Sequence, residues 1–129
     1  MKQFTVILLA ASLAGACSSG PIQGTWQYDG GVYNGTPRPP ATDFRMVRTY
    51  TSDAYEGLLI EGNTETRYTA GTYEIRNDSV YLTSTFSNQP SQLLGRSQAY
   101  RFRIENSRLT ISGFLPNGMQ VEEYWKKIK

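Results

Sequence analysis

The feature that most constrains the fold is an alternation of apolar and polar residues from Gly24 to the end of the chain. Successive side chains of a β-strand point to opposite faces, so a period of two predicts strands with one buried face. Turn-forming residues interrupt the pattern at regular intervals, as at Asn77-Asp78, Asn106-Ser107 and Pro116-Asn117-Gly118. We expect eight strands, at Gly24–Tyr28, Asp43–Tyr50, Gly57–Glu61, Glu65–Arg76, Ser79–Phe86, Ala99–Glu105, Arg108–Phe114 and Met119–Ile128.

Short connections between these strands predict an antiparallel meander. A long meander gains stability by closing, because an open sheet leaves two unpaired edges. The predicted fold class is therefore all-β, an eight-stranded antiparallel up-and-down barrel, with a bulge or bend at Gly71. Such a barrel has room for its own side chains or for one small ligand. The alternation predicts these inward side chains: Phe44, Met46, Tyr50, Leu58, Ile60, Tyr73, Ile75, Val80, Leu82, Phe86, Tyr100, Phe102, Ile104, Leu109, Ile111, Val121 and Trp125.

The two ends of this barrel are expected to differ. Connections after odd-numbered strands of a meander lie at one end, and connections after even-numbered strands lie at the other. The two longest, Asp29–Thr42 and Ser87–Gln98, both follow odd-numbered strands and predict an open mouth. The first strand starts at the opposite end, the floor, and the last strand finishes there. Trp26 should therefore meet the Trp125-Lys126-Lys127 run at the floor.

The first residues have the form of an export signal. Lys2 is followed by an apolar run from Phe4 to Ala16, which is too short to span a bilayer stably and ends in small residues. The single cysteine, Cys17, comes directly after this run. Leu13-Ala14-Gly15-Ala16-Cys17 resembles the bacterial lipobox, with Ala14 at a position where Leu is usual. The resemblance implies that Cys17 is acylated and becomes the new N-terminus, and the alternative is an ordinary signal peptide with an incidental cysteine.

These segments predict the domain organisation. Residues 1–16 are expected to form a lipoprotein signal peptide, residues 17–23 the lipidated cysteine and a tether, and residues 24–129 the barrel domain. Ser18 resembles the outer-membrane sorting signal of enteric lipoproteins. The expected location is therefore the cell envelope, where Cys17 would anchor the protein to the outer membrane.

Catalysis is not expected from this sequence. The chain has 0 histidines and no cysteine after Cys17, so a histidine base, a cysteine nucleophile and the usual zinc ligands are missing. Glu122 and Glu123 are adjacent and would point to opposite faces of a strand, which prevents a carboxylate pair. A net charge of +2 gives no electrostatic footprint for nucleic acid. We expect no enzyme activity, cofactor, metal or nucleic-acid partner.

Four motifs together resemble one family. Gly24-Thr25-Trp26 is similar to the Gly-x-Trp signature of lipocalins and their calycin relatives. With GTYEI at 71–75, RLTISG at 108–113 and VEEYWKKI at 121–128, the chain resembles small lipocalin-like lipoproteins of Gram-negative gut bacteria, a domain family of unknown function. The resemblance implies that Trp26 plugs the floor and is packed by a basic side chain, Lys126 or Lys127, through a cation–π contact. The chain departs from typical lipocalins in its shorter length, in lacking the C-terminal helix and in having Lys where they have Arg.

Two charged residues fall on the inward face of the predicted strands. Arg48 lies between Met46 and Tyr50, and Glu123 lies between Val121 and Trp125. Burying an unpaired charge is costly, so the two residues either pair with each other or hold the head group of a ligand. A register error of one residue, which would leave both in solvent, is the third alternative. Arg48-Thr49-Tyr50 also resembles the Arg-x-Tyr carboxylate clamp of fatty-acid-binding proteins.

Two functions are consistent with these patterns. The first is a lipid-anchored barrel that binds a small hydrophobic or amphipathic ligand. The second is a non-enzymatic interaction module, or an accessory subunit of an envelope complex, that has a filled core and acts through its loops. The volume of the interior separates the two. For the first, the expected ligand-binding residues are Phe44, Met46, Arg48, Tyr50, Tyr73, Phe102 and Glu123.

Overall fold

The computed structural model describes residues 20–129. The predicted signal peptide and the acylation of Cys17 therefore lie outside the described residues. All of the regular structure in residues 20–129 is β-strand. Within that range no helix is long and apolar enough to cross a membrane.

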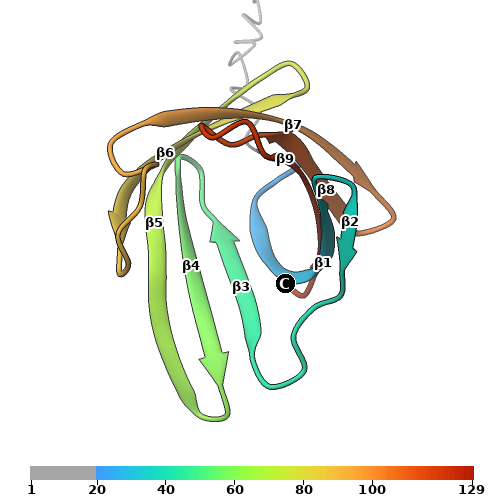
Figure 1. Ribbon diagram of the computed structural model, residues 1–129, viewed down its shortest axis with the longest axis vertical. Helices are drawn as coiled ribbons and strands as arrows, with labels where there is room; N and C mark the ends of the chain where they lie inside the picture. The colour runs from blue at the N-terminus through green and yellow to red at the C-terminus, as the bar shows by residue number, and fades with distance from the viewer. Residues whose placement is uncertain (1–19) are drawn as a thin grey trace, which may run out of the picture.

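Nine antiparallel strands form one sheet, which closes into a barrel (Figure 1). The sheet order is β2-β1-β3-β4-β5-β6-β7-β8-β9, and β1 also pairs with β9. Eight strands thus close on themselves and β2 is a short addition beside β1, which confirms the predicted fold class. The strands are β1 (Gly24–Tyr33), β2 (Thr36–Arg38), β3 (Arg45–Tyr50), β4 (Ala54–Glu61), β5 (Thr64–Arg76), β6 (Ser79–Ser87), β7 (Ser97–Glu105), β8 (Arg108–Phe114) and β9 (Gln120–Lys127).

The first connection differs from the expectation. The prediction of a loop from Asp29 to Thr42 is wrong in its first part, because β1 continues to Tyr33 and the chain then turns back as β2. Gly30 has a φ of +94° at a register shift between β1 and β9, which lets the strand bend and continue. Asn34 and Gly35 both have positive φ, as a two-residue hairpin turn requires.

The turns at the floor also contain residues with positive φ. β5 and β6 are joined at Asn77, with φ +55°, and β7 and β8 at Asn106-Ser107, with φ +50° and +61°. Asparagine tolerates the left-handed region better than most residues, which suits these tight turns. The longer connections, 39–44 and 88–96, lie at the opposite end, so the barrel has a short-looped floor and a long-looped mouth.

The prediction of the interior is wrong at three positions. Gly57 pairs with the inward Arg48, and Tyr55 pairs with the inward Tyr50, so Leu58 and Ile60 fall on the outer face. Phe86 pairs with Ala70 beyond a bulge, where Arg67 stacks on its ring at 4.2 Å. The register shift between Ala70 and Gly71 confirms the predicted bulge at Gly71, and it changes the parity of β6 so that Phe86 faces outward. The buried core cluster consists of Ile22, Trp26, Tyr50, Tyr55, Tyr73, Val80, Leu82, Tyr100, Leu109, Ile111, Val121 and Trp125.

Candidate functional site

The floor is built on Trp26, whose side chain is fully buried. Its indole Nε1 donates a hydrogen bond of 2.9 Å to the carbonyl oxygen of Ile22. Lys127 pairs with Trp26 across β1 and β9, and its Nζ lies 5.6 Å from the centroid of the indole ring. Lys126 is exposed and pairs with Gln27, one position away on the other face. Of the two lysines, the structure places Lys127 over Trp26.

Trp125 lies one layer above the floor. It is 1 % exposed and meets the ring of Tyr28 edge-on, with centroids 5.4 Å apart. Tyr73 also belongs to this filled lower part: its ring packs edge-on against Tyr50 at 5.3 Å, and its hydroxyl donates to the carbonyl of Thr51. The lower half of the barrel is therefore occupied by its own aromatic side chains.

Arg48 lies directly above this aromatic layer. Its guanidinium carbon is 4.9 Å from the Trp125 ring centroid and 5.6 Å from that of Tyr55. Nη1 donates a long hydrogen bond of 3.4 Å to the hydroxyl of Tyr50, whereas the enclosed Nε has no partner. The inward register of Arg48 is thus the one expected, and the alternative of a solvent-facing Arg48 does not hold.

Glu123 is held by a short relay of hydroxyl groups. The Tyr33 hydroxyl donates to Glu123 Oε2 at 3.0 Å, and the Tyr28 and Tyr33 hydroxyl oxygens are 2.5 Å apart. Burial and the nearby Glu123 charge raise the pKa of Tyr33 well above its ordinary value, and burial also raises the pKa of Tyr28. Both hydroxyls therefore remain protonated donors at neutral pH. Arg48 and Glu123 form no salt bridge with each other in residues 20–129, so the alternative in which the two charges pair directly is not seen.

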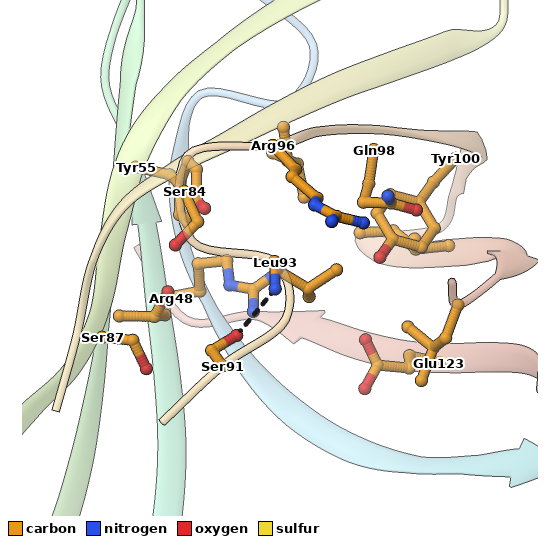
Figure 2. A pocket seen from close by; sticks show the side chains of 14 residues that line it. Arg48, Tyr55, Ser84, Ser87, Ser91, Leu93, Arg96, Gln98, Tyr100 and Glu123 are labelled. Atoms are coloured by element: carbon orange, nitrogen blue, oxygen red, sulfur yellow. Dashed lines mark hydrogen bonds between the residues drawn. The ribbon is translucent and has the colours of Figure 1, made fainter. Parts of the chain in front are cut away.

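Two hollows share Glu123 in their lining. One is an interior cavity of about 220 Å³ that extends from Arg48 to the connection between β6 and β7, including Ser91, Leu93 and Arg96 (Figure 2). The other is a more open crevice of about 600 Å³ at the mouth. Glu123 lines both. The crevice is lined by Tyr28, Tyr33, Asn34, Thr36, Arg38, Pro39, Ala41, Phe44, Met46, Met119 and Glu123.

The expected ligand-binding residues are only partly brought together. Phe44 and Met46 line the mouth crevice, Arg48 lines the interior cavity and Glu123 lines both. The other three, Tyr50, Tyr73 and Phe102, pack in or against the core and line neither hollow.

Sequence reasoning missed several lining residues. Tyr33 was not expected because the first strand was predicted to end at Tyr28, before the bulge, and Tyr28 itself was not included among the predicted inward side chains. The Asn34-Gly35 pair is a hairpin signal that could have corrected this. Arg96 and Ser91 come from a long connection whose path across the mouth leaves no periodic signal.

Catalytic and metal-binding arrangements are not evident in the described residues. Glu122 faces outward and accepts a hydrogen bond of 3.0 Å from Tyr124, whereas Glu123 faces inward, so the two carboxylates do not share a site. Residues 20–129 contain no group of three or more side chains suited to hold a metal ion.

Comparison with solved structures identifies the architecture. A lipocalin-like protein from Bacteroides uniformis ATCC 8492 superposes with a TM-score of 0.60 at 13% identity, covering 84% of this chain and 100% of that one. An uncharacterized protein from Bacteroides eggerthii DSM 20697 gives 0.59 at 10% identity, covering 82% and 98%. No protein-family model matches the sequence, and no curated protein matches it. The closed eight-stranded barrel and these neighbours together confirm that the chain has a lipocalin-like fold.

Proposed function

We propose that this protein binds a small amphipathic molecule at the mouth of its barrel. The observation that carries the proposal is the crevice of about 600 Å³, whose size lies in the range of small-molecule sites. Phe44, Met46 and Met119 supply apolar walls, and Tyr33 and Glu123 supply a few polar groups at one side. Such a mixture suits a ligand with an apolar body and a polar end.

The interior cavity extends this site toward Arg48. Because Glu123 borders both hollows, a ligand seated in the crevice can direct its polar end past Glu123 into the barrel. The filled aromatic layer of Trp125 and Tyr73 sets the depth that such a ligand can reach. We infer a binding role without catalysis, since no carboxylate pair faces either hollow.

An interaction module is the second candidate. Two large apolar side chains at the mouth end are exposed, Leu94 by 50% and Phe114 by 63%, and they offer contact points for a protein partner. In that case the crevice would bind no small molecule.

Ligand binding is tested by native mass spectrometry and by titration with a hydrophobic fluorescent probe. We expect the purified protein to carry a small molecule that dissociates on activation, or to bind the probe stoichiometrically once stripped. Met46→Glu places a charge against the apolar wall and should weaken probe binding at least about tenfold, the factor that corresponds to ~1.4 kcal/mol. Thr64→Glu, at the exposed tip between β4 and β5, is the matched control and should bind as the unaltered protein does. A purified protein that carries no small molecule and does not bind the probe would favour the interaction module.

We further propose that the barrel is a lipoprotein, anchored through Cys17 with its floor toward the membrane. Ile22 is fully buried and its carbonyl binds Trp26, which fixes the entry of the chain at the floor. The three residue steps from Cys17 to Gly20 span at most about 11 Å. An anchor at Cys17 would therefore hold the floor close to the lipid and point the mouth away from it.

This orientation is tested on purified, reconstituted lipoprotein with spin labels. Mass spectrometry of the N-terminus first establishes the acyl group, and an unmodified or absent Cys17 would refute the anchor. A label at Asn106, in a floor turn, should then lie closer to the bilayer surface than one at Asn34, in the mouth hairpin. The reverse order of depths would show that the mouth opens toward the membrane.

A further inference from the structure

Three buried polar side-chain atoms in residues 20–129 have no hydrogen-bond partner: Arg48 Nε, the Tyr68 hydroxyl and Trp125 Nε1. Buried polar groups are nearly always paired, and each exception needs an explanation. The arginine and indole nitrogens can only donate, and the tyrosine hydroxyl can donate as well. A ligand that satisfied these three atoms would therefore have to supply hydrogen-bond acceptors.

All three atoms belong to side chains around one guanidinium group. The ring of Trp125 lies 4.9 Å from the Arg48 guanidinium carbon. Gly57 is the cross-strand neighbour of Arg48, and a Cβ added to Gly57 would lie 2.8 Å from Cζ of Tyr68. The Tyr68 ring therefore covers Gly57 beside Arg48. Strands β3, β5 and β9 thus bring three donors to one region of the interior, where Arg48 lines the cavity and Tyr68 and Trp125 pack behind it.

The charge of the interior cavity also favours an anion. Two arginines, Arg48 and Arg96, line it against one carboxylate, Glu123, which already accepts a hydrogen bond from Tyr33 (Figure 2). Ser91 at the rim accepts a hydrogen bond from the Leu93 amide through its oxygen, so its own proton remains available to a ligand.

We propose that Arg48, with Arg96 and Ser91 at the rim of the cavity, forms an oxyanion subsite, which receives the carboxylate or phosphate end of an amphipathic ligand. The inference rests on the proposed function and adds the chemical class of the ligand and the direction in which it enters. A guanidinium forms strong, charge-assisted hydrogen bonds with such groups. The cavity of about 220 Å³ is smaller than most complete ligand sites, so it holds the head group while the apolar chain lies in the mouth crevice.

Isothermal titration with four probes tests this class: decanoate, decyl phosphate, decanol and inorganic phosphate. We expect at least one of the two chain-bearing anions to bind about tenfold or more tightly than decanol, since a hydrogen bond to a charged group contributes ~1.5–3 kcal/mol. The stronger of the two identifies the head group, and inorganic phosphate should bind more weakly than either. Equal binding of decanol and both anions would overturn the subsite but leave the proposed function standing. If none of the four probes bound, both the subsite and the proposed function would be overturned. If inorganic phosphate bound as tightly as decyl phosphate, the placement of the head group in the cavity and of the chain in the crevice would be overturned.

Arg96→Gln tests the position of the head group. Arg96 lines the cavity from an exposed position at its rim, so the ligand-free variant should melt at the same temperature as the unaltered protein. The affinity for the preferred anion should fall about three- to fivefold, as expected for a partly exposed charge pair, while the affinity for decanol should not change. Arg103→Gln, on the outer face beside Glu105, is the control and should alter neither affinity. An unchanged anion affinity in Arg96→Gln would overturn the placement of the head group in this cavity.

Discussion

Replacing Trp26 with alanine should lower the free energy of unfolding by about 3–5 kcal/mol, the usual cost of deleting a large buried aromatic side chain. Trp26 is fully buried, its indole nitrogen is hydrogen-bonded to Ile22, and Lys127 lies over its ring. The substitution would therefore open a cavity at the floor and leave the carbonyl oxygen of Ile22 without its donor. It would also remove the ring that Lys127 contacts. Urea denaturation followed by circular dichroism measures the loss.

Tyr81→Ala is a suitable comparison. Tyr81 is a partly buried aromatic residue on the outer face, where Arg76 stacks on its ring at 4.7 Å. Such an exposed contact contributes about 0.5–1 kcal/mol. If Trp26→Ala cost no more than Tyr81→Ala, Trp26 would not be the packed closure of the floor.

Replacing Gly71 with alanine should also destabilise the barrel, by about 1–3 kcal/mol. A Cβ at Gly71 would clash with the backbone carbonyl of Thr83 on β6 and would press on the ring of Tyr55. Backbone atoms of a paired strand cannot rotate away as a side chain can, so β5 and β6 must separate at their bulge. The same urea denaturation measures the effect.

The neighbouring Thr72→Ala is the control for this change, because Thr72 is exposed on the same strand. It should alter the free energy of unfolding by no more than about 0.5 kcal/mol. A Gly71→Ala protein as stable as Thr72→Ala would mean that β5 and β6 are farther apart at the bulge than the structure shows.

The ends of the barrel were predictable because they depend only on the order of the strands. In an antiparallel meander each connection changes ends, whatever the register of the individual strands. The meeting of Trp26 with the final strand follows from this alone. The facing of Leu58 and Ile60 was not predictable in the same way, since it depends on where β4 begins to pair with β3. Tyr50 opposite Tyr55 sets that register, and no local pattern reveals it.

The binding site was predictable only in part for the same reason. Arg48 and Glu123 lie on strands with unbroken alternation, so their inward facing follows from the sequence. Tyr68 lies at a bulge in β5, where the register against β4 shifts. The position of Arg48 over Trp125 also depends on the closure of the barrel, a long-range contact that no sequence window contains.

The pairing of β1 with β9 has a consequence for how the chain acquires its structure. Trp26 pairs with Lys127, so the contact that closes the barrel joins opposite ends of the domain. Folds dominated by contacts of such long sequence separation acquire their structure slowly. Until β9 is in place, both β1 and β8 present an unpaired edge to other chains. Damage to β9 should therefore appear first as aggregation during biogenesis and refolding, before any ligand can be assayed.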